Sequence, residues 1–290
     1  MQLKAGATLG LQADRYAGPM RLAALFLVLA VLVPAASAQA PLLQALQRAR
    51  QQCGAAGPPL QPNPQLDEAA RRLSRGATLS GALQASGYRA QRSVQWSLRG
   101  YRSPQAAVQA LVPQHCKALA DPGLREVGLQ HAGGSWWVIA AAPFAPPASG
   151  QSGDVASRVL ALVNQARAQP RRCGSQAFGA AGPLAGNRLL AQAAQVHADS
   201  MARHGYLEHR GRDGSTPVER VDRTGYRWRS VGENIASGQT SAEQVVRGWL
   251  ASPEHCVNIM EPRFTEMGVA FAVNKASTGG IYWAQVFGRR

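Results

Sequence analysis

The sequence contains few aromatic residues, few carboxylates and almost no lysine. Phe, Trp and Tyr make up 6% of the 290 residues, but 46% of the residues are apolar, so Ala, Leu and Val can still build a core. There are 16 Asp and Glu against 31 Lys and Arg, which gives a formal net charge of +15. The only lysines are Lys4, Lys117 and Lys275, so arginine carries almost all of the positive charge. This composition excludes a fully disordered chain and favours anionic partners.

Several signatures of specific chemistry are also missing. The sequence has no GxSxG, HExxH, GxGxxG or P-loop pattern, and it has no CxxC or CxxH pair that would indicate a cysteine-based zinc site. No run of Lys and Arg exceeds two residues. A nucleic-acid stripe is therefore not indicated, whereas an anionic envelope polymer or an anionic membrane remains open as a partner.

The N-terminal segment has the pattern of a secretory signal. Arg21 precedes an apolar run at 22–33, and Ala36-Ser37-Ala38 supplies small residues at a cleavage site. The run is too short for a comfortable membrane span. We therefore predict that residues 1–38 are a signal peptide and that the mature protein is secreted or periplasmic, with no transmembrane span. A retained N-terminal anchor is the alternative, and because Met20 begins a compact signal by itself, translation of residues 1–19 stays open.

The mature chain contains four cysteines, Cys53, Cys116, Cys173 and Cys256. Export permits disulfides, and an even number of cysteines fits two bridges. Four cysteines allow three connectivities, and their spacing alone does not select one of them.

An internal repeat divides the mature chain. Cys116–Gly128 aligns without a gap on Cys256–Gly268, with coincident Cys, Pro, Glu and Gly, and His115 precedes one segment as His255 precedes the other. Other matches keep the same order: Cys53-Gly54 with Cys173-Gly174, Pro59-Leu60 with Pro183-Leu184, Gly87-Tyr88 with Gly225-Tyr226, and Gly133-Gly134 with Gly279-Gly280. We therefore predict two related lobes, 41–145 and 154–290, joined by a Pro/Gly/Ser-rich linker at 146–153.

The repeat also selects a disulfide pattern. If both lobes share a fold, each closes its own bridge, Cys53–Cys116 and Cys173–Cys256. The chain-entropy model gives about 4 kcal/mol of stabilisation for loops of this length. The alternative is that the first lobe is a small unrelated domain with coincidental cysteine spacing.

Hydrophobic periodicity predicts the elements of the second lobe. Helices are expected from about 155 to 170, from 184 to about 204 and from 241 to 250, where Pro253 follows as a stop. The Gly-rich stretch 205–227 reads as a loop, and strands are expected at 268–273 and 281–287. Helices with a small antiparallel sheet make an α+β domain.

Ordered motifs in the second lobe resemble one known family. They are His197–Met201, His209, Gly214–Pro217, Arg220, Gly225-Tyr226, Gly232–Gly238, Trp249–His255 and Phe264–Gly268. This set resembles the bacterial branch of the CAP superfamily, the SCP-like domain of cysteine-rich secretory, antigen 5 and pathogenesis-related 1 proteins. The resemblance spans about 154–288. It implies a three-layer α-β-α sandwich with a surface cleft, and it fits a Cys173–Cys256 bridge.

The resemblance also implies a cleft lined by two His and two acidic residues. By motif these positions fall on His209, Glu233 and His255, but the fourth, three residues after Trp249, is Ser252. The four-residue pattern is therefore incomplete, and the neighbouring Glu254 does not occupy the same position.

Three roles are open for the cleft residues. Two neutral imidazoles can hold Zn²⁺ weakly, with Glu233 orienting one of them. The same three residues could transfer protons, although no nucleophile is evident. The third role is structural, with Glu233 and Asn234 anchoring a loop by hydrogen bonds. His197, in the middle of a predicted helix, is expected to be a packed imidazole, and no cofactor is certain.

The first lobe lacks most of the histidine and acidic residues that would line such a cleft. Gln95-Trp96-Ser97 stands where Gly232-Glu233-Asn234 stands in the second lobe, and the segment that carries His209 has no counterpart. We interpret 41–145 as a degenerate repeat of the same fold without cleft chemistry.

Three function classes follow. The leading hypothesis is an exported binding module for a lipid, sterol or peptide in the His/Glu-lined cleft, because lipid and sterol binding is what the resemblance suggests. The second is a metal-assisted hydrolase acting on peptide or cell-wall substrates, which the missing acidic residue and nucleophile disfavour. The third is a cationic protein that associates with an anionic envelope polymer.

Overall fold

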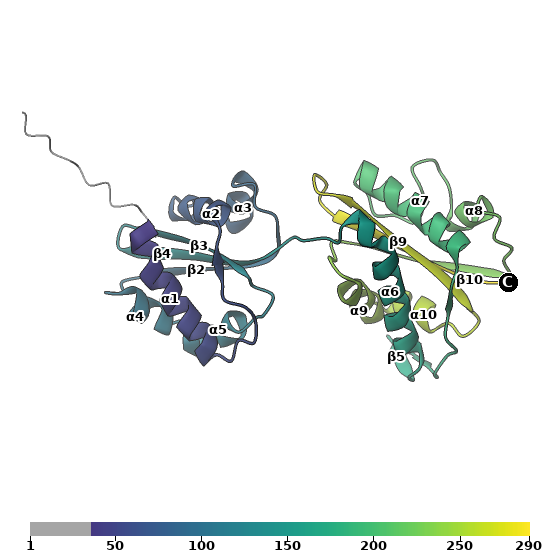
Figure 1. Cartoon of the computed structure of the whole chain (residues 1–290), viewed down its shortest axis with the longest axis horizontal. Helices are drawn as coiled ribbons and strands as arrows, with labels where there is room; N and C mark the ends of the chain where they lie inside the picture. The colour runs from purple at the N-terminus through teal and green to yellow at the C-terminus, as the bar shows by residue number, and fades with distance from the viewer. Residues whose placement is uncertain (1–35) are drawn as a thin grey trace, which may run out of the picture. The chain divides into compact units, whose positions relative to one another are not determined.

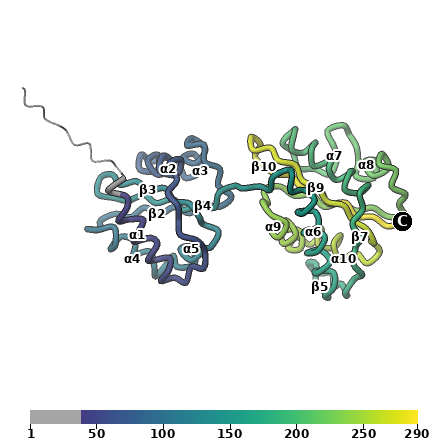
Figure 2. Tube along the Cα trace, viewed as in Figure 1, coloured from purple at the N-terminus to yellow at the C-terminus, as the bar shows by residue number. Residues whose placement is uncertain are grey.

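The computed structural model describes residues 36–290, with side chains from Gln39 onward, as two lobes that each combine helices with a sheet (Figures 1 and 2). The predicted signal sequence lies outside the described residues, apart from its last three positions, which begin helix α1. Within the described part of the chain, no helix is long and apolar enough to cross a membrane.

The N-terminal lobe is a four-stranded sheet with helices on both faces. Its strand order is β1-β3-β4-β2, with β1 parallel to β3 and the other pairs antiparallel. Its elements are α1 (Ala36–Gln52), β1 (Gln61–Pro62), α2 (Pro64–Ser74), α3 (Leu79–Ala85), β2 (Ala90–Arg99), α4 (Pro104–Gln109), α5 (Val112–Leu119), β3 (Glu126–Ala132) and β4 (Ser135–Pro143).

The C-terminal lobe repeats this topology. Its sheet order is β7-β9-β10-β8, with β7 parallel to β9, and a two-stranded hairpin β5-β6 is added. A 3₁₀ turn at Ser149–Gln151 precedes it, and its elements are α6 (Ser152–Arg167), β5 (Arg171–Cys173), β6 (Gln176–Phe178), β7 (Ala185–Gly186), α7 (Arg188–His204), α8 (Pro217–Asp222), β8 (Ser230–Ser237), α9 (Ala242–Ala251), α10 (Pro253–Met260), β9 (Glu266–Asn274) and β10 (Gly280–Arg289).

Strand β10 shows why the C-terminal lobe has three layers. It is buried on both faces, and its side chains alternate with the period of two that strands impose. Trp283 and Phe287 pack in the cluster formed with α6, α9 and α10, whereas Tyr282 and Val286 pack in the cluster formed with α7 and α8. The sheet therefore lies between two helical layers, and the predicted α+β three-layer sandwich is confirmed.

A shared glycine sets the distance between helix and sheet in each lobe. A Cβ added at Gly268 of β9 would lie 2.0 Å from the backbone nitrogen of Ala191 in α7. The repeat-aligned Gly128 of β3 would place a Cβ 2.0 Å from the carbonyl carbon of Leu66 in α2. A side chain cannot fit at either position, so the glycine that coincides in the two halves of the repeat serves close packing of α7 and α2.

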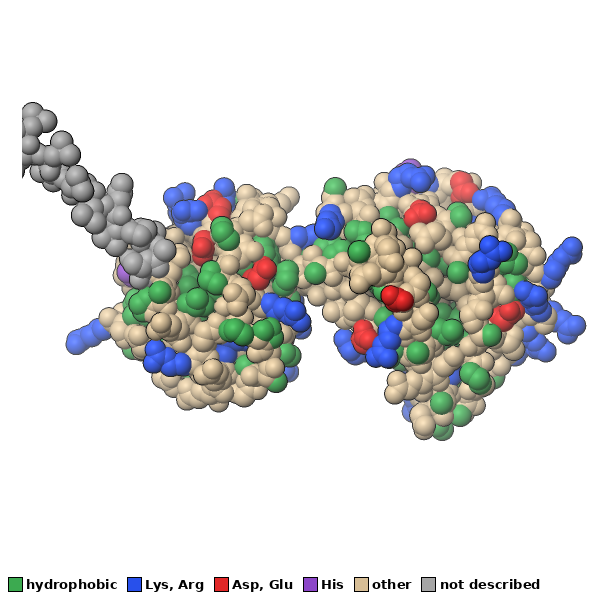
Figure 3. Space-filling model, in the orientation of Figure 1, with side chains coloured by type: hydrophobic (Ala, Val, Ile, Leu, Met, Phe, Trp, Pro, Cys, Tyr) green, Lys and Arg blue, Asp and Glu red, His purple; other side chains and the backbone are tan. Residues whose placement is uncertain are grey.

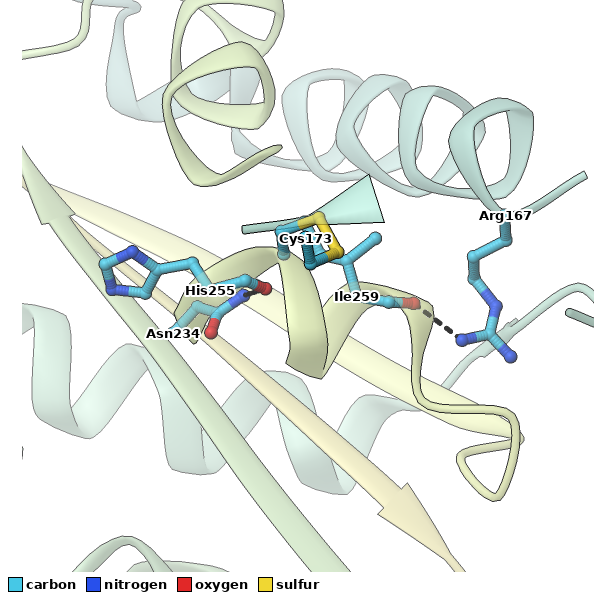
Figure 4. The surroundings of a disulfide bond; sticks show 6 residues. Arg167, Cys173, Asn234, His255 and Ile259 are labelled. Atoms are coloured by element: carbon cyan, nitrogen blue, oxygen red, sulfur yellow. Dashed lines mark hydrogen bonds between the residues drawn. A yellow bond between two sulfur atoms is a disulfide. The ribbon is translucent and has the colours of Figure 1, made fainter. Parts of the chain in front are cut away.

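Each lobe also contains one disulfide and, near the end of its first helix, a buried arginine. The bridges are Cys53–Cys116 and Cys173–Cys256, which are the two pairs that the repeat predicts. Arg167, at the end of α6, donates to the carbonyl oxygens of Gly182, Ile259, Glu261 and Phe264. Figure 4 shows the bond to Ile259. Arg50 of α1 makes the corresponding bonds to the carbonyls of Leu119, Asp121 and Leu124. Each guanidinium thus caps the last turn of the helix that carries the second cysteine, α10 or α5.

The structure corrects several element predictions. Helix α7 begins at Arg188, because Asn187 caps it by accepting from two backbone N–H groups and the preceding residues pair as β7. Pro253 does not end helical structure, since it is the first residue of α10. The expected loop at 205–227 contains the short helix α8, and the segment around Glu233, expected to be a loop, is strand β8.

We predict that Arg167→Met lowers the free energy of unfolding by about 3 kcal/mol, because it removes the donor from two buried and two partly buried hydrogen bonds. Urea denaturation of the mature chain measures this change. The matched control is Arg158→Met on the same helix, where the exposed ion pair with Glu243 should contribute less than about 1 kcal/mol. Equal losses in the two variants would contradict the capping role.

Candidate functional site

Glu233 lies at the centre of a polar cluster that it forms with His209 and Arg220 in the C-terminal lobe. It lies on β8 with only 2% of its side chain exposed. Its Oε1 accepts from Nδ1 of His209 at 2.8 Å, and its Oε2 accepts from Nη2 of Arg220 at 2.8 Å. Because a carboxylate offers only lone pairs, Nδ1 of His209 carries the proton, and Nε2 is left to face solvent on a side chain that is 52% exposed.

Arg220 holds the loop that carries His209 in place by hydrogen bonds. It is buried on α8, and besides Glu233 it donates to the backbone oxygens of His209 and Ser215. The short helix begins with a capping box in which Thr216 and Glu219 exchange hydrogen bonds, so the position of Arg220 is fixed by local sequence. Because the buried Arg220 has Glu233 as its one carboxylate partner among the described residues, Glu233 is structurally necessary.

His197 is a packed residue behind this cluster. Its ring is fully buried in α7, it meets the Tyr206 ring edge-on at 6.2 Å, and its Nε2 donates to the backbone oxygen of Glu208 at 2.9 Å. The nearest oxygen of Glu233 is 3.9 Å away. Burial lowers the pKa of His197 although Glu233 opposes this shift, so the ring is neutral at physiological pH.

His255 contacts strand β8 from the other helical layer through its backbone oxygen. It lies near the start of α10, is half-buried, and its backbone oxygen accepts from Nδ2 of Asn234, the neighbour of Glu233 (Figure 4). Asn258 donates to the Glu233 backbone oxygen and to the Asn234 side chain, which ties α10 to β8. Burial lowers the pKa of the His255 imidazole, and the positive form of His209 acts in the same direction.

The donor set does not match a complete zinc centre. Zinc sites use three or four protein ligands, but both oxygens of Glu233 are engaged by His209 and Arg220. Ser252 is the N-cap residue that precedes α10, and Glu254 is exposed. In the region covered by the structure, no three His, Cys, Asp or Glu side chains are grouped so that they could hold an ion. Zinc binding therefore rests on His209 and His255 alone and stays a prediction.

Sequence reasoning gave no role to two residues that hold the site. Arg220 belongs to the quoted motifs, and its position directly after the Thr216–Glu219 capping box was the available signal. Asn258 has no signal in one sequence, because its bonds to Glu233 and Asn234 are made only when α10 packs on β8.

The strand register also corrects the comparison between lobes. In β8, Glu233 is opposite Val286, which is itself opposite Gly268. In β2, Gln95 is opposite Ile139, which is opposite Gly128. Gln95 therefore occupies the place of Glu233, and the alignment that assigned Trp96 to this place was wrong by one residue. Trp96 corresponds to Asn234, and its ring lies 6.2 Å from that of His115, as Asn234 contacts His255.

Comparison with known proteins agrees with this architecture. The sequence profile of the CAP family (Cysteine-rich secretory protein family) matches residues 160–287. The C-terminal lobe is a CAP domain. The chain is also 31% identical over 105 residues to the uncharacterized protein YkwD of Bacillus subtilis, covering 36% of this chain and 39% of that protein. The CAP domain thus accounts for the similarity over less than half of either sequence.

One solved structure extends the comparison beyond the CAP domain. Na-ASP-1 superimposes with a TM-score of 0.55 at 10% identity, covering 88% of this chain and 90% of that chain. Because the CAP domain is less than half of the chain, this shared fold includes the N-terminal lobe. An extracellular protein with an SCP domain from Bacillus anthracis aligns over 73% of this chain and 71% of that chain, at 16% identity and a TM-score of 0.41.

We expect Glu233→Gln to lower the free energy of unfolding by about 3 kcal/mol, since it leaves the buried Arg220 without a counter-charge. Urea denaturation at neutral pH measures the loss. Glu243→Gln is the matched control, because its partner Arg158 is exposed and screened by water. If Glu233→Gln is no more destabilising than the control, Glu233 does not anchor the site.

The buried imidazoles predict how stability depends on pH. The folded pKa values of His197 and His255 are lowered by burial, so below the unfolded value of about 6.5 the unfolded chain binds more protons. Stability is therefore complete above about pH 6.5 and falls as the pH drops below that value. His197→Gln, which keeps an N–H donor, should flatten this loss in urea titrations at several pH values. His204→Gln, an exposed position of the same helix, should leave the slope unchanged, and identical slopes in both variants would contradict the assignment.

Proposed function

We propose that this protein is an exported lipid-binding protein whose CAP domain holds a single-chain anionic amphiphile, such as a fatty acid. The observation that carries the proposal is an apolar groove of about 610 Å³ between α6 and α9. Its lining residues are Leu162, Gln165, Ala166, Gln169, Arg171, Glu243, Val246, Arg247, Leu250 and Ala251. This volume falls within the range of about 300–1,000 Å³ that small-molecule sites occupy in proteins.

The groove is apolar because two amphipathic helices meet along it. Ala166 and Val246 are buried at its base, and Leu162 and Leu250 are half-buried along its walls. Leucine side chains left partly open to water lose about 25 cal/mol of transfer free energy for each Å² that stays exposed. An acyl chain in the groove would cover this surface, at about 0.8 kcal/mol for each buried methylene.

The charges at the groove favour an anionic head group. Arg171 and Arg247 line it, and the one carboxylate in the lining, Glu243, is paired with Arg158 at 2.7 Å. That hydrogen bond lowers the pKa of Glu243, so its charge is already compensated. Neither guanidinium has a carboxylate within salt-bridge distance among the residues that the structure describes, and two such groups beside an apolar groove match a carboxylate or phosphate on an apolar chain. A sterol has no such charge, and an extended peptide would need more backbone partners than the two glutamines provide.

The His/Glu cleft stays a second candidate for ligand contact but gains less support. Nε2 of His209 is accessible and could accept a proton, yet Glu233 is shared with Arg220 and no side chain of the cluster is placed as a nucleophile. Hydrolysis by this cluster therefore has no observation in its favour. The two disulfides fit an oxidising compartment and therefore support export of the protein.

Binding of a fluorescent fatty acid to the mature protein tests the proposal. We expect saturable binding that weakens about tenfold in Leu250→Gln, because a polar group replaces part of the apolar wall. Arg247→Gln should weaken binding of palmitate but not of its methyl ester, which has no head-group charge. Competition with unlabelled palmitate and its ester measures both effects.

Glu233→Gln provides the contrast between the two sites. If the groove is the lipid site, folded Glu233→Gln protein at low temperature keeps its fatty-acid affinity. Loss of binding in Glu233→Gln with full binding in Leu250→Gln would move the ligand to the cleft. Absence of saturable binding in the unaltered protein would overturn the proposal.

A further inference from the structure

One end of the CAP domain carries a cluster of arginines, here called the arginine patch. It consists of Arg223, Arg227, Arg229, Arg289 and Arg290, all exposed. The segment before β8 and the end of β10 lie side by side, because the backbone N–H of Arg229 donates to the backbone oxygen of Arg289 at 2.7 Å. Figure 3 shows Lys and Arg side chains gathered at this end of the C-terminal lobe, where the chain ends.

Most of the charge of the patch is not neutralised. Arg223 pairs with Asp213 at 2.8 Å, and Arg290 lies 3.4 Å from Glu266 and over the ring of Tyr226. For Arg227, Arg229 and Arg289, no carboxylate of the described residues lies within salt-bridge distance. Three arginines without an ion-pair partner therefore face solvent on one small surface, where their fields add, and the neighbouring Asp222 carboxylate offsets one of the three charges.

An exposed tryptophan stands inside the patch. Trp228 lies between Arg227 and Arg229 in the sequence and is 39% exposed, one of the few large apolar side chains left in water. Its Nε1–H donates to Oδ1 of Asp222 at 2.7 Å, which holds the indole in one orientation. A fixed indole costs little entropy when it enters an interface, because its rotamer is already selected.

We propose that the arginine patch docks the protein on an anionic phospholipid bilayer. Guanidinium groups bind phosphate oxygens through two parallel hydrogen bonds, and a tryptophan between them suits the depth of the head groups, where an indole has both apolar and polar surroundings. A soluble polyanion would use the arginines but would gain little from the indole. The patch shares no residue with the groove between α6 and α9, so failure of one proposal leaves the other standing.

Sedimentation with vesicles tests this docking surface. The mature protein should bind phosphatidylcholine vesicles that contain phosphatidylglycerol, should not bind phosphatidylcholine alone, and should be released by salt. Replacing Arg227, Arg229 and Arg289 together by Gln should weaken vesicle binding about 100-fold, from roughly fivefold for each arginine near the surface. Trp228→Ala should weaken it about tenfold, whereas Trp228→Phe should recover part of the loss.

A matched charge control separates this patch from the general basicity of the chain. Replacing Arg172, Arg188 and Arg203 by Gln removes the same charge from exposed positions elsewhere in the CAP domain and should leave vesicle binding nearly unchanged. Equal losses in the two triple variants would overturn the proposal, because they would show that overall charge is sufficient. Melting curves confirm that each variant is folded before its binding is compared.

Heparin as a soluble polyanion decides between a membrane and a polymer. If the bilayer is the partner, Trp228→Ala weakens vesicle binding and leaves heparin binding unchanged. Vesicle binding that does not respond to Trp228→Ala, or tight heparin binding without vesicle binding, would assign the patch to an anionic polymer and overturn the membrane proposal.

Discussion

Both lobes depend on a buried guanidinium that fixes the end of one helix against another. Arg167 and Arg50 carry their charge into the interior without a carboxylate partner, and burial lowers the pKa of both. Backbone carbonyls compensate the charge, and they are the groups that a helix C-terminus leaves unpaired. The same helix, α10 or α5, also carries the second cysteine of the bridge. The arginine and the disulfide therefore both attach this helix to the N-terminal part of its lobe.

A common scaffold with different surface chemistry follows from this constraint. The C-terminal lobe adds the segment that contains His209 and α8, and this segment brings Arg220 to Glu233 on β8. The N-terminal lobe keeps the sheet order, the tight glycine and the disulfide, but it places Gln95 where Glu233 lies. The fold as such does not need a carboxylate on this strand. Glu233 is needed because Arg220 is buried beside it.

The chemistry of the CAP domain is therefore divided among three surfaces of different character. The His209–Glu233 pair is polar and internally compensated, the groove between α6 and α9 is apolar with an arginine rim, and the arginine patch is charged with one exposed indole. A polar cluster whose hydrogen bonds are already made gains little free energy from binding a ligand. Exposed leucines and guanidinium groups without an ion-pair partner gain free energy when a ligand covers or pairs with them. The proposed lipid partners complement the groove with an acyl chain and the arginine patch with an anionic head group.

The sequence by itself determined the α+β class, the order of motifs, the repeat and the cysteine pairs, because these features are recorded in spacing and in residue types that coincide between the halves. It also predicted that His209, Glu233 and His255 line one cleft, and of these three the structure joins His209 to Glu233 by a hydrogen bond. Only the tertiary structure decided that Glu233 is on a strand, that Arg220 occupies half of its carboxylate, and that Gln95 rather than Trp96 is its counterpart. A shift of one residue in strand register moves every side chain of the strand to the opposite face of the sheet. The short segment around Glu233 has no periodicity from which its register could be predicted. The groove was likewise decided by tertiary structure, since it exists only where α6 and α9, about eighty residues apart in sequence, lie against each other.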